Sequence, residues 1–274
     1  IVLHSAIMGR EVVKESDGKV WLRCGSGETW DDIVAYAVEK GWHGAENLSL
    51  IPGEVGASAV QNIGAYGAEA KDLITKVEAV EIATGNVVEF SNEDCRYAYR
   101  QSRFKNEWKD HYVITYVTYC FSLDFCPDLD YGNIRHSLEE QGISKPTAQQ
   151  LRQTIINIRE AKLPDPKVTG NAGSFFMNPV VGRDVYERLA AQYEGMPHYV
   201  VDADHIKIPA GWMIEQCGWK GASLGRAGVH DRQALVLVNR GGATGEEVVT
   251  LYKRIIEDVR AKFGIEIHPE VNVI

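Results

Sequence analysis

The sequence predicts an α+β fold built from two lobes that divide near residues 145–165. Its 274 residues are enough for one large or two medium domains, each with its own core. The composition, 45% hydrophobic and 24% charged, is ordinary for a soluble globular protein. Strand and hairpin signals prevail before the division, and capped amphipathic helices prevail after it. There are no internal repeats and no low-complexity tracts.

The first lobe begins with a strand and a helix. Residues 20–24 are a short strand candidate. Thr29, followed three positions later by Asp32, predicts the start of a helix. We expect this helix to run to about Lys40 and to stop at Gly41.

Three further segments complete this lobe. Residues 51–67, IPGEVGASAVQNIGAYG, are rich in glycine but also apolar, which predicts an ordered loop rather than a flexible linker. Residues 76–90 alternate around a Thr-Gly-Asn turn and predict a β-hairpin. Residues 112–123 are rich in β-branched and aromatic side chains and predict a long strand.

Helix signals dominate the second lobe. Thr147 with Gln150 forms a capping box, and the helix behind it ends at the Leu-Pro-Asp-Pro of residues 163–166. Its apolar face carries Leu151, Ile155 and Ile158. Residues 183–193 predict a second helix.

The last part of the chain reads as strand, helix and strand. Residues 234–239 predict a buried strand. Thr244 with Glu247 caps a helix that ends at Gly264. Residues 265–274 alternate apolar and polar side chains, which predicts a final strand.

Charge and cysteine content exclude several classes of partner. The net charge of −9 argues against a nucleic acid or an anionic membrane as partner. The five cysteines are odd in number and form no CxxC, so neither a disulfide framework nor a zinc site is expected, and the histidines suggest no other metal site. No stretch resembles a membrane span or a signal peptide, which predicts a cytoplasmic protein.

The glycine-rich residues 51–67 could aim backbone N–H groups at one anion, such as a pyrophosphate. They match neither the Rossmann nor the Walker pattern. Taken alone, a tight structural turn is the more frequent explanation.

Ser174 lies in NAGSFFMNP, residues 171–179, between a glycine and two aromatic residues. In a dry pocket such a serine can serve as a proton donor or a nucleophile. No GxSxG surrounds it, so a hydrolase elbow is not indicated. A loop serine bonded to backbone is the alternative.

Two charged groups have both a functional and a structural explanation. Arg100 opens RQSRFK, whose cations could bind a carboxylate or phosphate or simply form a solvated helix face. Glu270 lies among apolar residues of the final predicted strand and could act in a site or point to solvent.

Taken together, these segments favour the functional explanation of each over the structural one. IPGEVGASAVQNIGAYG, CRYAYRQSRFK, AKLPDPKVTGNAGSFFMNP, AGWMIEQCGWKGASLGRAGVHDRQALVLVN and the closing HPEV occur in the order and approximate spacing of one family. The sequence closely resembles the UDP-N-acetylenolpyruvoylglucosamine reductases over nearly its whole length.

The resemblance implies a fold of the vanillyl-alcohol-oxidase type that binds FAD. Residues 1–163 would be the remainder of the FAD-binding domain, with 265–274 returning to it, and residues 164–264 would be an α+β substrate-binding domain. The implied reaction takes hydride from NADPH through FAD to UDP-N-acetylglucosamine enolpyruvate and yields UDP-N-acetylmuramate for peptidoglycan synthesis. The partner would be a UDP-sugar, and the insertion that carries Tyr131 resembles the type I form.

The resemblance also assigns residues. Ser174 would be the proton donor, with Arg100 and Glu270 as further catalytic residues that stabilise an enolate-like state. Lys162 would bind the diphosphate, and Tyr131, Asn178 and Gln233 would contact substrate. The matching flavin loop consists of Gly53, Ser58, Asn62, Ile63, Gly64, Ala65 and Tyr66.

Two departures from the family pattern stand out. The family normally has a longer N-terminal part with a GxGSN-type loop for the FAD pyrophosphate, whereas this sequence opens with Ile-Val-Leu. We therefore expect a fragment or processed form that binds FAD weakly and has impaired activity. Met177 replaces the lysine often found at its position. The rival interpretations are another flavoprotein of the same fold, such as a sugar oxidase, and a substrate-binding module without activity.

Overall fold

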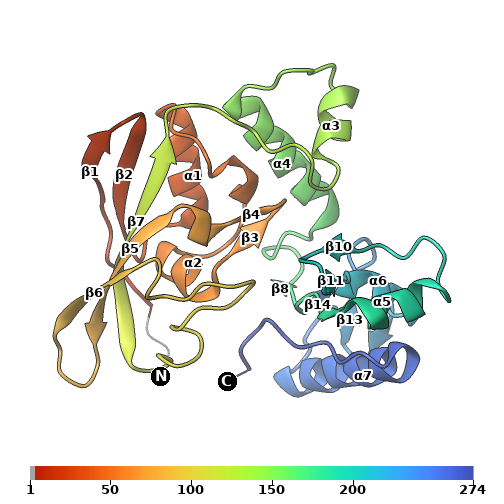
Figure 1. Ribbon diagram of the computed structural model, residues 1–274. Helices are drawn as coiled ribbons and strands as arrows, with labels where there is room; N and C mark the ends of the chain where they lie inside the picture. The colour runs from red at the N-terminus through yellow and green to blue at the C-terminus, as the bar shows by residue number, and fades with distance from the viewer. Residues whose placement is uncertain (1–3, 274) are drawn as a thin grey trace. The chain divides into compact units, whose positions relative to one another are not determined.

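The computed structural model describes residues 4–273 and divides the chain into two compact units. One unit runs to Arg159 and the other begins at Glu160 (Figure 1). The boundary therefore falls inside helix α4 (Ala148–Lys162), within the predicted range of 145–165.

A five-stranded antiparallel sheet forms the centre of the first unit (Figure 1). In spatial order its strands are β1 (Arg10–Ser16), β2 (Lys19–Gly25), β7 (Tyr112–Ser122), β5 (Ile74–Glu81) and β6 (Val87–Ser91). The predicted strand at 20–24, the hairpin at 76–90 and the long strand at 112–123 are confirmed as β2, β5–β6 and β7.

One face of this sheet is buried under two helices. Successive side chains of a strand point to opposite faces, and the alternate residues Val20, Leu22 and Cys24 are fully buried. Helices α1 (Trp30–Glu39) and α2 (Val55–Gln61) share one apolar cluster with β2 and β7. The sheet thus supplies a rigid support for α2 and the loop that follows it.

The predicted first helix has its expected bounds. It begins after Thr29, although the Thr29 side chain makes no capping hydrogen bond. Gly41 follows in the left-handed region, at φ 72°.

The expectation of a loop throughout 51–67 was wrong. Residues 55–61 form α2, and strand β3 (Gly64–Ala65) pairs with β4 (Ala68–Glu69). Short 3-10 turns at Glu46–Leu48 and Ala70–Asp72 flank this region. The high glycine content concealed a short helix because Val55 and Ala59 gain burial against the sheet.

Helix α4 packs against α3 (Ile134–Glu140) in a smaller apolar cluster of the first unit. The buried residues of this cluster are Ile134, Leu138, Leu151, Ile155 and Ile158. The predicted Thr147–Gln150 capping box is confirmed, with backbone-to-side-chain distances of 2.9 and 3.2 Å.

The strands of the second unit form two small antiparallel sheets. The order of the first is β12 (Ser223–Leu224), β13 (Ala227–Val229), β14 (Val236–Asn239) and β8 (Asn171–Ser174). The order of the second is β10 (Tyr199–Val200), β11 (His205–Lys207) and β9 (Val180–Gly182). β14 confirms the buried strand predicted at 234–239.

The helices of this unit are α5 (Arg183–Ala190), α6 (Ala210–Gln216) and α7 (Gly245–Phe263). α5 confirms the helix predicted at 183–193, although it ends earlier. The capping box at the start of α7 and the left-handed Gly264 after it are also confirmed.

The final segment differs from the predicted strand. Residues 265–273 form no regular strand, only an isolated bridge between Phe176 and Pro269. Ile265 and Ile267 are buried in the core of the second unit. The apolar side chains of this segment alternate because every second residue packs on the core, although the segment does not form a regular strand.

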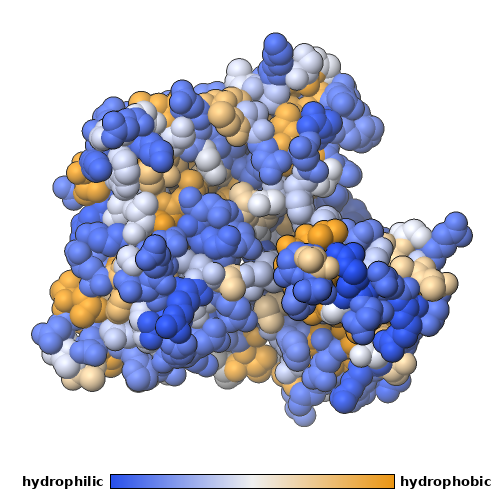
Figure 2. All heavy atoms as spheres, in the orientation of Figure 1, coloured by the Kyte–Doolittle hydropathy of each residue, from blue (hydrophilic) through white to orange (hydrophobic). Residues whose placement is uncertain are grey.

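The face seen in Figure 2 is predominantly polar, and the mean hydropathy of the chain is −0.22. Among residues 4–273, no helix is long and apolar enough to cross a membrane. The same part of the chain contains no cluster of three or more His, Cys, Asp or Glu side chains suited to a metal.

Candidate functional site

The first unit gathers the predicted flavin loop around α2. Gly53 is exposed at φ 111°, a conformation that favours glycine, and its carbonyl accepts from the Trp30 N–H at 3.0 Å. Ser58 instead faces the core, where its Oγ bonds the Val55 carbonyl at 2.7 Å and the Tyr119 hydroxyl at 2.6 Å. Burial raises the pKa of Tyr119. Ser58 is thus placed to hold α2 on the sheet.

Two residues of this loop have left-handed backbones. Asn62 ends α2 and Tyr66 follows β3, both at φ 47°. Between them, Ile63 donates to the Ser58 carbonyl at 3.3 Å, and Ala65 pairs with Ala68. The result is a compact backbone turn with closely spaced carbonyls.

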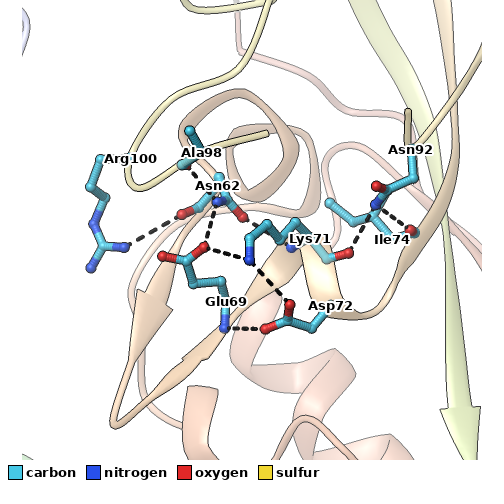
Figure 3. Close-up of polar contacts among 8 residues, drawn as sticks. All are labelled: Asn62, Glu69, Lys71, Asp72, Ile74, Asn92, Ala98 and Arg100. Carbon is cyan, nitrogen blue, oxygen red and sulfur yellow. Dashed lines mark hydrogen bonds and ion pairs between the residues drawn. The ribbon is translucent and has the colours of Figure 1, made fainter. Parts of the chain in front are cut away.

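Arg100 lies against these carbonyls (Figure 3). Its guanidinium donates to the carbonyl of Asn62 at 3.5 Å and to that of Gly64. Gly64 has to be a glycine here, since a Cβ would lie 2.8 Å from Nη1 of Arg100 and 2.8 Å from the Ala68 carbonyl oxygen. The structure thus joins the predicted catalytic arginine to the predicted flavin loop.

The Tyr131 segment packs on the other side of the same turn. The Asn47 side-chain amide donates both to the Tyr66 carbonyl, at 2.9 Å, and to the Asp128 carbonyl, at 3.0 Å. A Cβ at Gly67 would lie 3.4 Å from the Tyr131 side chain. Tyr131 therefore stands beside the tip of the β3–β4 hairpin.

Arg159 of α4 reaches both ends of the flavin loop. Its Nε donates to the carbonyl of Leu50 at 3.2 Å, and its guanidinium also bonds the Tyr66 phenol. Burial raises the pKa of Tyr66, an effect that the Arg159 cation opposes. Burial also lowers the pKa of Arg159.

An ion pair that the sequence analysis did not predict fixes Leu50, the residue just before the flavin loop. Asp31 accepts the Leu50 N–H at 2.6 Å and binds Arg152 at 2.7 and 2.9 Å. Leu50 itself is left-handed, at φ 57°. The one available signal was that Arg152 and Arg159 are seven positions apart and share a helix face.

A cavity of about 200 Å³ opens beside the start of α2. Its lining is Ser5, Ser26, Glu54, Gly56, Ala57, Val60, Phe104, Tyr112 and Ile114. Its lining combines apolar side chains with hydroxyl groups and the Glu54 carboxylate. Whole-ligand pockets usually exceed about 300 Å³, so a complete FAD would extend beyond this cavity.

In the second unit, Ser174 and Glu270 come from neighbouring segments. Ser174 ends β8 opposite Val236, and its residue is exposed. The next residue, Phe175, accepts the Glu270 N–H at 2.7 Å through its carbonyl. Buried rings of Phe175 and Phe176, 5.2 Å apart, anchor this strand end in the core.

Asn178 and Gln233 both lie beside the first residues of α6. Asn178 Oδ1 accepts the Ala210 N–H at 2.9 Å, and Gln233 Oε1 accepts the Leu235 N–H at 3.3 Å. A Cβ at Gly211 would lie 3.3 Å from Gln233 Oε1. Both amides are therefore held in place by backbone groups.

Lys162 is the exposed last residue of α4. Met177 is half-buried and donates its N–H to the His268 carbonyl at 3.0 Å, so this position is fixed by the tail. The predicted site residues fall into two sets: the flavin loop, Arg100 and Tyr131 in the first unit, and the remaining residues in the second.

Comparisons with known proteins show the family of the chain. The model of the C-terminal domain of UDP-N-acetylenolpyruvoylglucosamine reductase matches residues 165–274, and an FAD-binding domain model matches residues 1–91. A UDP-N-acetylenolpyruvoylglucosamine reductase of Bacteroides fragilis is 57% identical over all 274 residues, which span 81% of that protein. The chain belongs to the UDP-N-acetylenolpyruvoylglucosamine reductase family.

Other relatives extend this result. The reductase of Porphyromonas gingivalis W83 is 52% identical over the whole chain and 81% of its own length, and that of Paraburkholderia xenovorans is 46% identical over 98% and 79%. The crystal structure of the reductase from Thermus caldophilus superposes with a TM-score of 0.62 at 22% identity, covering 94% of this chain and 74% of that one. At that identity the superposition supports the fold alone.

Proposed function

We propose that this protein uses NADPH to reduce UDP-N-acetylglucosamine enolpyruvate to UDP-N-acetylmuramate, a step of peptidoglycan precursor synthesis. The observation that carries this function is the 57% identity with a reductase across the whole chain. It is an FAD-dependent oxidoreductase, in keeping with the FAD-binding domain match over residues 1–91.

FAD, when bound, supplies the hydride transfer from NADPH to the enolpyruvyl group. The first unit would hold it through the loop of Gly53, Ser58, Asn62, Ile63, Gly64, Ala65 and Tyr66. Backbone N–H and C=O groups would make most contacts, because the Ser58 and Asn62 side chains are buried and bonded within the protein.

Arg100 would bind the carboxylate of the enolpyruvyl group. A guanidinium matches a carboxylate bidentately, and its charge stabilises the enolate-like state that forms when the β-carbon is reduced. Its contacts to the carbonyls of Asn62 and Gly64 place this cation at the flavin loop.

Ser174 would then protonate the α-carbon, with Glu270 stabilising the same state. A serine hydroxyl is a weak acid, but a carbanion is a strong base, so the proton transfer is favourable. The exposed end of β8, with Glu270 bonded to the adjacent Phe175, supports this pairing.

The UDP part of the substrate would be bound mainly by the second unit. Lys162 would neutralise diphosphate charge, while Asn178, Gln233 and Tyr131 would contact the substrate. The held amides of Asn178 and Gln233 support this assignment because preorganised groups lose little entropy on binding. On this proposal the first unit binds FAD and supplies Arg100 and Tyr131, and the second unit supplies the remaining substrate contacts.

We also propose a cytoplasmic location. All five cysteines are free thiols, as expected in a reducing compartment. An acidic chain with net charge −9 favours small-molecule partners over nucleic acids.

Anaerobic flavin spectroscopy tests the function. We expect NADPH to bleach the flavin absorbance of the FAD-loaded protein, and UDP-N-acetylglucosamine enolpyruvate to restore it while UDP-N-acetylmuramate accumulates. UDP-N-acetylglucosamine, which lacks the enolpyruvyl group, is the matched control. Equal recovery with both compounds, or recovery only with oxygen, would contradict the proposal.

A further inference from the structure

Asn62 lies at the centre of a polar network that reaches from the flavin loop to Arg100 (Figure 3). Its side chain is completely buried. Both amide hydrogens are used, on Glu69 Oε2 at 3.0 Å and the Ala98 carbonyl at 2.8 Å. Its Oδ1 accepts the Lys71 N–H at 2.9 Å. A side chain occupied in this way acts within the protein and does not contact a ligand.

The contacts of Asn62 converge on Arg100 by two routes. Its side chain fixes Ala98, which forms a two-way backbone bridge with Gln101 at 3.1 and 3.0 Å around Arg100. Its main-chain carbonyl accepts from the guanidinium itself. Arg100 has a left-handed backbone, at φ 54°, so its turn has to be held by neighbouring contacts.

Glu69 fixes the orientation of the Asn62 amide. Its carboxylate accepts hydrogen bonds only, so the nitrogen of Asn62 has to face it. Lys71 forms an ion pair with the same oxygen at 3.1 Å. Glu69 also packs beside Arg100 at Gly64, where a Cβ would lie 3.1 Å from its Cγ and 2.8 Å from Arg100 Nη1.

We propose that Asn62, oriented by Glu69, is a positioning residue that holds the Arg100 guanidinium where it binds the substrate carboxylate. This inference rests on the proposed role of Arg100. On this proposal Asn62 acts on the step that involves the enolpyruvyl group.

Two variants of Asn62 test this role. N62D keeps the shape but loses both donors and places a carboxylate beside Glu69. N62G removes the side chain and still adopts the left-handed backbone without strain. The matched control is N92A, because Asn92 belongs to the same network and also donates two hydrogen bonds, to the carbonyls of Lys71 and Ile74 at 2.8 and 2.7 Å.

Calorimetry on the oxidised, FAD-loaded enzyme measures the affinity ratio between UDP-N-acetylglucosamine enolpyruvate and UDP-N-acetylglucosamine. The ratio isolates the carboxylate contact, and we expect about tenfold or more in the unaltered enzyme. N62D and N62G should lose most of this ratio, whereas N92A should keep it even if it lowers thermal stability equally. Stopped-flow reduction by NADPH should stay within about twofold of the unaltered enzyme in N92A.

R100Q separates the inference from the function on which it rests. If R100Q and both Asn62 variants lose the affinity ratio, the positioning role is supported. A loss in R100Q alone would overturn the role of Asn62 and leave that of Arg100 standing. An unchanged ratio in R100Q would reject the role proposed for Arg100, and the inference with it. Equal losses in N62G and N92A would show a general structural effect and would also overturn it.

Discussion

At the scale of single residues, polar side chains of the predicted site differ in what they bond. Ser58 and Asn62 spend their side chains on internal hydrogen bonds, whereas Ser174 is exposed at a strand end. Sequence position cannot separate these cases because the direction of a side chain depends on what covers it. Two predictions test individual positions.

Ser174→Ala tests the proton donor. The variant should be reduced by NADPH at a nearly normal rate, but its reoxidation by the enolpyruvyl substrate should slow by about 10²–10⁴-fold, since the proton transfer is lost. Rapid-mixing spectroscopy follows both half-reactions. The idea fails if reoxidation stays within about tenfold of the unaltered enzyme.

Gly64→Ala tests the contact between the flavin loop and Arg100. The added methyl would lie 2.8 Å from both Arg100 Nη1 and the Ala68 carbonyl oxygen, so the guanidinium has to move. We expect KM for the enolpyruvyl substrate to rise by at least about tenfold, the loss of one charge-assisted hydrogen bond.

At the scale of elements, α4 is anchored to the first unit by charge as well as by apolar packing. Arg152 binds Asp31, which in turn fixes Leu50 at the entrance to the flavin loop. Burial acts to raise the pKa of Asp31, but hydrogen bonds from Arg152 and Leu50 outweigh it and hold the pKa below its ordinary value. The attachment of α4 through Arg152 therefore depends on the ionisation of Asp31, and so on pH.

The stability of the first unit should therefore fall in acid. A carboxyl whose folded-state pKa is depressed stabilises the fold above its unfolded pKa, near 4, and this contribution is lost as pH falls through the folded pKa. In Asp31→Asn, the free energy of unfolding should drop by about 1–3 kcal/mol at pH 7 and vary less between pH 6 and 3. Denaturant titration at each pH measures this, and an unchanged pH slope would exclude the Asp31–Arg152 pair as its source.

Thr244→Ala tests an element of the second unit. Thr244 Oγ1 accepts the Glu247 N–H at 3.2 Å, and Glu247 returns the contact to the Thr244 N–H at 2.9 Å. Removing the hydroxyl should cost about 1 kcal/mol. Thr244→Ser keeps the cap and should stay close to the unaltered protein in thermal melts.

At the scale of the whole molecule, the described residues build separate apolar cores for the two units. The two units are therefore expected to unfold as distinguishable transitions. Asp31→Asn should shift one transition and Thr244→Ala the other.

A ligand should identify the transition that belongs to the second unit. UDP-N-acetylglucosamine at 100 times its Kd should stabilise it by about 2.7 kcal/mol. Differential scanning calorimetry with and without ligand tests this expectation. A single transition that both variants and the ligand move together would show that the units unfold as one.

The sequence by itself determined the elements whose signals are local. Capping boxes at Thr147 and Thr244 indicated two helix starts, alternation indicated β5 and β6, and β-branched and aromatic content indicated β7. Each of these signals depends on residues a few positions apart. Motif order over the whole chain indicated the family. It also named Ser174, Arg100 and Glu270, whose roles remain predictions.

Only the tertiary structure decided features that depend on distant partners. α2 formed within a glycine-rich segment because the sheet buries Val55 and Ala59, and the final segment stayed in the second unit because Ile265 and Ile267 pack on its core. The left-handed Leu50, the inward Ser58 and the Asn62 network likewise arise from groups far along the chain. Burial and hydrogen bonding against those groups outweigh local propensity, which is why no local pattern could reveal them.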